Sequence, residues 1–193
     1  GSAFYSCRVA NDETGDFFLQ QLGDHNIQTN KNSQRVEGLS GRCIVMVTPD
    51  AERTMHTYLG VSDSISISEM DFEAALNCEY IYLEGYLVTS DTARSAIIEM
   101  KDFAKSNGIK TAMTFSDPSM LEYFKDNVNE VLGDGVDLLF CNLREAQLWS
   151  GETDLDKAVE ALKTIAKQFA VTTGADGSIL YNGEQLLTIA PHP

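Results

Sequence analysis

The chain has 193 residues, of which 43% are hydrophobic, and 14 basic against 29 acidic side chains give a formal net charge of −15. A chain of this size can bury about 70% of its unfolded surface, and an acidic balance without a lysine or arginine cluster argues against nucleic-acid binding, because phosphate backbones would be repelled. No apolar run approaches the ~20 residues of a membrane span, and four well-separated cysteines without a Cys-x-x-Cys pair predict reduced thiols in a cytoplasmic protein.

The N-terminal part of the chain predicts one strand and one helix. Residues 3–9 are of β type, so we expect a strand there. Residues 16–22 are expected to form a helix, because Phe18 and Leu22 lie one turn apart. The polar stretch over residues 26–38 is expected to be an exposed loop.

A β-hairpin is expected after this loop. The runs over residues 42–48 and 53–58 are of β type, and a turn sequence separates them. Because no helix intervenes, the pair does not fit a parallel sheet. We therefore expect a β appendage over residues 39–59 on an α/β body formed by residues 1–38 and 60–193.

From residue 68 onward, strand and helix patterns alternate regularly. The expected strands cover residues 80–84, 110–115, 136–141 and 169–172. The expected helices cover residues 68–76, 90–106, 120–125 and 144–149, and a further helix follows a capping box at Thr153-x-x-Asp156. A last hairpin is expected to turn at Asn182-Gly183 in a type I′ turn. This alternation predicts an α/β fold with a mostly parallel sheet and helices on both faces.

The strand over residues 136–141 opens directly into Asn142-x-x-Glu145. An amide and a carboxylate one helical turn apart could hold a phosphate through water and Mg²⁺. The same pair also fits a helix N-cap with Glu at the third position, which is a capping box. The local sequence favours the cap, and the two interpretations are compatible.

A second polar segment, Thr172-Thr-Gly174-Ala-Asp-Gly177, follows the next strand. Its hydroxyl and backbone N–H groups could bind an anion, although it lacks the lysine of a Walker loop and the spacing of a dinucleotide fingerprint. The alternative is a glycine-containing turn between strands. One amphipathic helix separates the two polar segments, so their strands should be near each other, and ligands bind at the carboxyl ends of such strands.

Three further polar residues have two interpretations each. Glu84 ends an apolar strand and is either a solvated strand end or an acid that binds the hydroxyls of a polyol or ribose. Asp117, which precedes Pro118, is mainly expected to be a helix N-cap. Arg53 is a surface residue of the hairpin or, if the hairpin closes over a site, a ligand for anions and hydroxyls.

The order of these segments resembles the ribokinase-like (PfkB) family of carbohydrate and nucleoside kinases, over essentially the whole chain. The segments are Val9-Ala-Asn-Asp12-Glu-Thr-Gly15, similar to V-G-x-D-x-x-G; the hairpin from Gly41 to Tyr58, similar to the family's β lid; Leu83-Glu84-Gly85-Tyr86, at a strand end near the substrate; Asn142-x-x-Glu145, similar to N-x-x-E; and Thr172-x-Gly174-x-x-Gly177, similar to T-x-G-x-x-G. The hairpin is most similar to that of sugar and adenosine kinases.

The resemblance implies a ribokinase-like three-layer α/β/α sandwich with a small β lid, present here incompletely. It implies ATP and Mg²⁺ as cofactors, a sugar or nucleoside as substrate and, through the lid, a possible homodimer. The cofactor-binding residues that it implies are Asn142, Glu145, Thr172, Gly174 and Gly177, with Glu145 also serving the metal. The substrate-binding residues that it implies are Glu84 and Arg53.

Two family motifs are not found in the chain. The N-terminal Gly-Gly substrate motif would precede Ala3, and D-T-x-G-A-G-D, whose last Asp is the catalytic base, would follow Pro193. We therefore expect the middle of a kinase of roughly 300 residues, without a catalytic residue and without activity of its own. The alternative is a catalytically silent ribokinase-like protein that binds or senses a ligand; an unrelated oxidoreductase would need a dinucleotide fingerprint.

Overall fold

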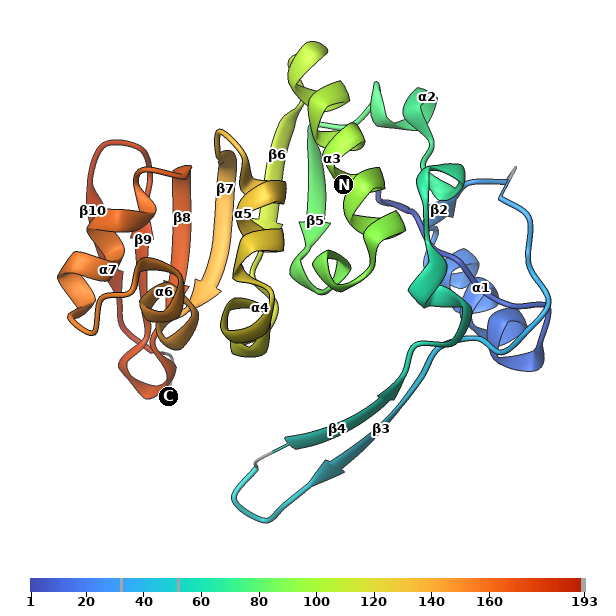
Figure 1. Ribbon diagram of the computed structural model, residues 1–193, viewed down its shortest axis with the longest axis horizontal. Coiled ribbons are helices and arrows are strands. Elements are labelled where there is room, and N and C mark those ends of the chain that lie inside the picture. The colour runs from blue at the N-terminus through green and yellow to red at the C-terminus, as the bar shows by residue number, and fades with distance from the viewer. Residues whose placement is uncertain (32, 52, 192–193) are drawn as a thin grey trace. The chain divides into compact units, whose positions relative to one another are not determined.

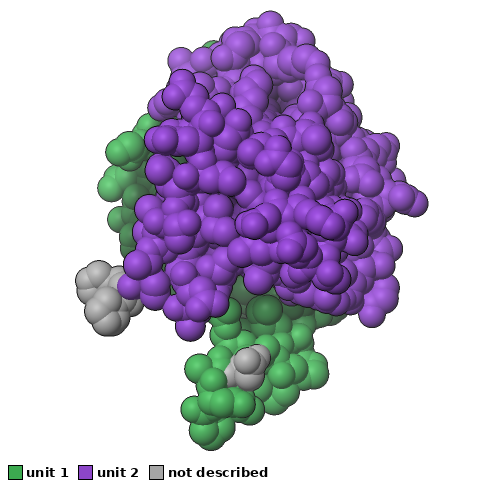
Figure 2. All heavy atoms as spheres, turned by 90° about the vertical axis from the view of Figure 1, so that its left-hand side faces the viewer, with its two compact units in different colours: residues 1–74 green, residues 75–193 purple. Residues whose placement is uncertain are grey.

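The computed structural model describes residues 1–31, 33–51 and 53–191, and the chain divides into two compact units (Figures 1 and 2). Unit 1 is Gly1–Ala74 and unit 2 is Ala75–Pro193. The division predicted from the sequence, a lid over residues 39–59 on a body formed by the rest, stays a prediction.

Unit 2 is built on a six-stranded mixed sheet in the order β10-β9-β8-β7-β6-β5 (Figure 1). Its strands are β5 (Tyr80–Glu84), β6 (Lys110–Thr114), β7 (Val136–Asn142), β8 (Ala166–Thr172), β9 (Ser178–Tyr181) and β10 (Leu186–Ile189). β5 to β8 are parallel, whereas β9 and β10 add antiparallel pairs. The α/β class and the mostly parallel sheet predicted from the sequence are confirmed.

Five α-helices of unit 2 lie over one face of this sheet in Figure 1. They are α3 (Asp91–Ser106), α4 (Pro118–Tyr123), α5 (Lys125–Leu132), α6 (Leu143–Ser150) and α7 (Leu155–Leu162). The strand register places Leu83, Met113, Leu139 and Phe169 in one row, and all four side chains are buried. These long apolar side chains form the centre of the core, and the row fixes the register because a slip of one residue would turn it out of the core.

The long helix α3 forms where the pattern predicts it. The Ser90 hydroxyl caps its N-terminus by accepting from Ala93 N–H. The face with Ala93, Ile97 and Met100 is buried, as the 3.6-residue period requires. Asn107 ends the helix, and Gly108 follows in the left-handed region at φ +68°.

Three local predictions in unit 2 are wrong. α4 and α5 form on either side of Phe124, where one helix was expected. α7 is capped by Asp154, whose carboxylate accepts from Lys157 N–H at 3.0 Å, so the Thr153 capping box does not form. Tyr181 pairs with Leu186, which leaves a four-residue loop instead of the two-residue type I′ turn.

Unit 1 is mostly irregular. The short strands β1 (Phe4–Tyr5) and β2 (Gln28–Thr29) pair in parallel, and α1 (Glu13–Asp24) lies between them in the sequence. The predicted strand is thus shorter than expected, and the predicted loop contains β2. α1 begins earlier than predicted, because Asp12 caps it by accepting from Gly15 N–H at 2.9 Å.

The predicted hairpin forms as a separate two-stranded sheet of β3 (Arg42–Val47) and β4 (Arg53–Tyr58). The 3-10 helices Gly60–Ser64 and Ile67–Glu69 and the helical turn α2 (Phe72–Ala75) follow. In the described ranges of the chain, no helix combines the length and hydropathy that crossing a bilayer requires.

Replacing Gly85 by alanine is expected to destabilise unit 2. A Cβ atom at this position would lie 2.4 Å from Phe115 O and 2.7 Å from Thr114 O, so the chain after β5 would have to move away from the chain after β6. We expect a loss of about 1–3 kcal/mol, the usual range for overpacking, in urea unfolding followed by circular dichroism. Gly23→Ala in α1 is the control, since its added Cβ meets no atom within 4 Å. An equal loss in the control would contradict the steric explanation.

Candidate functional site

Four parallel strands of unit 2 end at the same edge of the sheet, and polar residues stand at these ends. Asn142 at the end of β7 is the register partner of Thr172 at the end of β8. Glu84 at the end of β5 is the partner of Thr114 at the end of β6. Neighbouring strands are about 4.8 Å apart, so these residues span roughly 14 Å of one edge. The prediction that the two polar segments follow neighbouring strands is confirmed.

The Asn142–Glu145 pair forms the predicted capping box at the start of α6. Asn142 Oδ1 accepts from Glu145 N–H at 2.8 Å, and Glu145 Oε2 accepts from Asn142 N–H at 2.9 Å. A second side-chain bond joins Asn142 Nδ2 to Glu145 Oε1 at 2.9 Å. The amide and the carboxylate are therefore fixed relative to each other and to the end of β7.

Glu145 is a buried carboxylate with only 3% of its surface exposed. Burial raises the pKa of Glu145 above its ordinary value, and the nearby charge of Asp117 raises it further, whereas the hydrogen bond from Asn142 N–H opposes this. A carboxylate held in this way favours a positive partner, which would offset the cost of burying its charge.

Magnesium fits this end of the site as an ion with few protein ligands. Among the residues that the structure describes, no group of three or more His, Cys, Asp or Glu side chains is arranged to hold a metal. Mg²⁺ usually keeps several waters and binds through one or two carboxylates together with substrate phosphates. Glu145, whose pKa is raised in part by the nearby charge of Asp117, is a carboxylate that could serve in this way.

The segment after β8 is a tight turn. The N–H group of Thr173 donates to Gly177 O at 2.9 Å, and the N–H group of Gly177 donates to Gly174 O at 3.2 Å. Gly174 and Gly177 lie in the left-handed region at φ +63° and +95°. The glycine turn between strands is therefore what the segment forms, and Thr172 and Gly174 are exposed on it. Anion binding by this turn stays a prediction.

Glu84 has a neighbour that the sequence analysis missed. The hydroxyl of Ser116 donates to Glu84 Oε2 at 3.1 Å. Ser116 has φ +70°, an unusual backbone conformation for a residue other than glycine, and such strain gathers at functional sites. The predicted cap at Asp117 is confirmed, since its carboxylate accepts from Ser119 N–H at 2.8 Å at the start of α4. The only signal for Ser116 in the sequence is its position between the end of a predicted strand and the predicted helix cap at Asp117.

Arg53 belongs to unit 1. It begins β4, pairs with Val47 in the hairpin and is exposed. Its role toward a substrate stays a prediction.

A groove of about 490 Å³ lies at the opposite edge of the sheet, at the amino ends of β6, β7 and β8. Its lysines already have partners: Lys105 pairs with Asp134, Lys167 pairs with Asp137, and Lys101 donates to the carbonyls of residues 131 and 132. These carbonyls end α5, where a positive charge stabilises the helix. These lysines therefore have partners within the fold, and the predicted site residues of unit 2 lie at the opposite, carboxyl edge of the sheet.

Comparison with known proteins identifies similar chains. The family described as pfkB family carbohydrate kinase matches residues 1–193. An adenosine kinase from Schizophyllum commune is 27% identical over 136 residues, which are 68% of this chain and 38% of that protein.

Solved structures have the same fold. The crystal structure of adenosine kinase from Sinorhizobium meliloti has a TM-score of 0.93 and 29% identity, and the match covers 100% of this chain and 59% of that one. A protein from E. coli provisionally named ribokinase II, in complex with ATP and Mg²⁺, has a TM-score of 0.88 and 18% identity over 100% of this chain and 63% of its own. The chain thus spans less than two thirds of each of these proteins.

Proposed function

Because the chain belongs to the pfkB family of carbohydrate kinases, we propose that it is part of an ATP-dependent kinase that phosphorylates a hydroxymethyl group of a sugar or nucleoside. The observation that carries this proposal is the pairing of Asn142 with Thr172 at the ends of β7 and β8. It puts the N-x-x-E pair and the glycine turn side by side on one edge of the sheet, where a triphosphate could reach both.

The nucleotide end of the site uses Asn142, Glu145 and the turn after β8. Thr172 and the backbone at Gly174 and Gly177 would contact the ATP phosphates. The buried Glu145 and the Asn142 amide would orient the waters around Mg²⁺, which when bound supplies charge neutralisation for phosphoryl transfer. An E. coli protein of the same fold binds both ATP and Mg²⁺, which supports this assignment.

The acceptor end of the site uses Glu84. Its carboxylate, to which Ser116 donates, would accept hydrogen bonds from substrate hydroxyls. β5 lies three strands from β8, or roughly 14 Å away at the usual spacing, which leaves room for an acceptor and a triphosphate side by side. Arg53 would contact the substrate from the hairpin as the lid closes and excludes water.

The proposal also covers the substrate class, the cellular location and the partners of the enzyme. The similar proteins include adenosine kinases, and the family is one of carbohydrate kinases, so the substrate would be a small molecule. We place the enzyme in the cytoplasm, without a nucleic-acid or membrane partner, and with the exposed hairpin as the surface for a possible homodimer.

Phosphoryl transfer from radiolabelled ATP tests the proposal. A protein of family length that contains this segment is expected to phosphorylate adenosine, ribose or fructose when Mg²⁺ is present and not when it is chelated. The 193-residue chain alone is expected to transfer nothing, because the D-T-x-G-A-G-D motif with its catalytic Asp is not among its residues.

Each other outcome has a distinct meaning. Transfer by the 193-residue chain would contradict its predicted inactivity. Saturable binding of a sugar or nucleoside by the longer protein without transfer would favour the alternative, a catalytically silent binding or regulatory protein. The absence of both binding and transfer across the whole panel would overturn the kinase proposal.

A further inference from the structure

The hairpin of unit 1 is exposed along its whole length. β3 and β4 pair at six positions, from Arg42 with Tyr58 to Val47 with Arg53, and every residue of both strands is exposed. An isolated two-stranded ribbon is at best marginally stable in water. The direction of this hairpin must therefore be set by the segments that hold its base.

The base is a close contact between two segments that we call the legs. The first leg is residues 38–41, before β3, and the second leg is residues 60–64, after β4. Val61 N–H donates to Leu39 O at 2.9 Å and joins them. A Cβ atom on Gly60, which has φ +54°, would lie 2.2 Å from Leu39 O, so only glycine allows the two backbones to approach this closely.

Asp12 holds the first leg. Ser40 is 2% exposed, and its hydroxyl donates to Asp12 Oδ1 at 2.6 Å while its N–H donates to Oδ2 at 3.0 Å. Arg42, the first residue of β3, reaches the same carboxylate at 3.4 Å. The hydrogen bonds from Ser40 hold the pKa of Asp12 well below its usual range, so the carboxylate stays charged.

The stretch of chain that contains Asp12 also contacts Ser40 through Ala10. The Ser40 hydroxyl accepts from Ala10 N–H at 2.9 Å. Arg35 donates to Ala10 O at 2.7 and 3.0 Å and to Asp12 O at 3.1 Å. The backbone over residues 10–12, which binds the first leg, is thus itself held by charged hydrogen bonds, and such bonds are roughly twice as strong as neutral ones.

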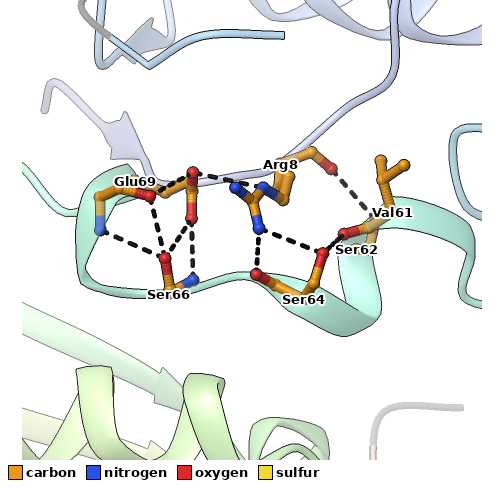
Figure 3. Close-up of polar contacts among 7 residues, drawn as sticks. Arg8, Val61, Ser62, Ser64, Ser66 and Glu69 are labelled. Atoms are coloured by element: carbon orange, nitrogen blue, oxygen red, sulfur yellow. Dashed lines mark hydrogen bonds and ion pairs between the residues drawn. The ribbon is translucent and has the colours of Figure 1, made fainter. Parts of the chain in front are cut away.

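Arg8 holds the second leg (Figure 3). Its guanidinium donates to the carbonyl of Ser64 and, at 3.1 Å, to the Ser64 hydroxyl, and Ser62 Oγ donates back to Arg8 O at 3.2 Å. Its Nε atom lies 3.4 Å from a carboxylate oxygen of Glu69, which is 2% exposed. Glu69 also accepts from Ser66 N–H at 2.8 Å, so the chain after β4 wraps around this one arginine.

We propose that residues 8–12 are the mount of the hairpin, in which Arg8 and Asp12 are positioning residues that hold one leg each and together set the direction of the hairpin. The mount is one short, continuous stretch of chain, so both legs are attached to the same segment of backbone. The glycines of the legs lack side chains that could fix the hairpin, and the polar contacts of the mount take that role.

The length of the hairpin amplifies any movement of its base. Six paired residues extend about 20 Å, so a rotation of about 10° at the legs would move Arg53 by roughly 3 Å. In an active site, a displacement of about 1 Å can cost roughly 100-fold in rate. This consequence for the kinase rests on the proposed function, whereas the mount itself does not.

The distance between the hairpin and α1 tests the mount in the 193-residue chain. Spin labels are placed with Thr54→Cys and Gln20→Cys, after Cys7, Cys43 and Cys78 are replaced by serine, and the distance distribution is measured by double electron–electron resonance. The background is expected to give one narrow distribution. Ser40→Ala and Arg8→Met are each expected to broaden or shift it by several Å. Exchange of the backbone amide of residue 40 is expected to become roughly tenfold faster in Ser40→Ala, as the loss of the charged hydrogen bond from the hydroxyl to Asp12 implies.

A change in overall stability alone would not move this readout. Ser106→Ala, which removes a hydroxyl that donates to Asp102 O in α3, is the control and should leave the distribution unchanged. Ser40→Thr and Arg8→Lys should restore a narrow distribution in part. If Arg8→Met does not fold, Ser64→Ala, which removes one hydroxyl of the second leg, decides that half of the test.

Unchanged distributions in Ser40→Ala and in the second-leg variant would overturn the mount. The measurement needs no phosphoryl transfer, so it can fail while the kinase proposal stands. Conversely, an inactive longer protein with a narrow hairpin distribution would overturn the kinase proposal and leave the mount in place.

Discussion

Replacing Glu145 by glutamine is expected to lower the kcat of Mg²⁺-dependent phosphoryl transfer by about 100-fold in a protein of family length, the scale on which one preorganised electrostatic group contributes to catalysis. Glutamine keeps the shape of the side chain and removes its charge. Glu145 faces Asn142 from inside the fold, so the loss would come from weaker orientation of the metal and its waters. Steady-state kinetics across Mg²⁺ concentrations is the measurement.

The same variant is expected to lose less stability than Asn142→Ala, because glutamine keeps an acceptor for Asn142 N–H, although its NH2 group cannot accept from Asn142 Nδ2. Glutamine is accepted at the third position of a capping box, so the cap on α6 is kept. Asn142→Ala is the matched variant, because it also disturbs the site but removes the cap and leaves the buried carboxylate with the backbone N–H of residue 142 as its one remaining donor from this position. We expect it to cost about 2–3 kcal/mol. Equal stability losses in the two variants would show that Glu145 serves the cap alone.

The pH dependence of stability separates the two variants further. Burial raises the pKa of Glu145 in the folded state, so the stability linked to its protonation is present below the unfolded pKa of about 4.3 and is lost as the pH rises through the folded pKa. Over that window the stability of the parent chain should fall relative to that of Glu145→Gln. A constant difference between the two across the acidic range would contradict the raised pKa.

The sequence predicts this part of the site well because the relevant pattern is local. A buried strand followed by Asn-x-x-Glu allows few structures other than a cap, and consecutive parallel strands joined by a short helical crossover, here α6 and α7, are usually neighbours. The neighbouring positions of β7 and β8 follow from these two facts, whereas the register that pairs Asn142 with Thr172 is a finding of the structure. The proposed role of the pair toward Mg²⁺ does not follow from the cap: the local sequence allows it as an alternative, and the resemblance to a family favours it.

Other features depend on contacts that no local pattern contains. Ser116 takes a left-handed conformation at a tight turn in which Asp117 N–H donates to Phe115 O at 2.9 Å. Phe115 is itself held by partners far away in the sequence, because its N–H donates to Phe140 O at 3.2 Å and Gly85 packs against its carbonyl. The mount of the hairpin joins Arg8 to Ser64 across 56 residues of sequence. Only the folded chain shows such partners.

The loop between β9 and β10 shows how a local pattern can mislead. Asn-Gly between β-type runs is a strong signal for a two-residue turn. Here the Asn182 side chain accepts from the N–H groups of Glu184 and Gln185, both at 2.9 Å, and this bonding stabilises a longer loop. The side chain of asparagine competes with the backbone for hydrogen bonds, which propensity alone does not resolve.

Replacing Gly177 by alanine is expected to destabilise unit 2 by roughly 2–5 kcal/mol, because backbone strain and a steric clash add. Gly177 has φ +95° and ψ −127°, a region that is essentially restricted to glycine. A Cβ atom would lie 2.0 Å from Ile189 O and 3.0 Å from Pro191 N, so the end of β10 would have to move. The single tryptophan, Trp149 in α6, makes fluorescence-monitored urea unfolding a readout of this unit.

Gly174→Ala separates the role of the turn in the fold from its role toward a nucleotide. Gly174 also has a positive φ, +63°, but a Cβ atom there meets no atom within 4 Å, so the expected cost is about 1–2 kcal/mol. If the exposed part of the turn binds the ATP phosphates, Gly174→Ala in a protein of family length should raise the KM for ATP more than its small stability loss explains. Since Gly177 N–H is bonded to Gly174 O within the turn, Gly177→Ala tests the closure of the turn, whereas Gly174→Ala tests its proposed contact with the nucleotide. Equal stability losses at the two glycines would contradict the steric account, and an unchanged KM in Gly174→Ala would remove the turn from the nucleotide site.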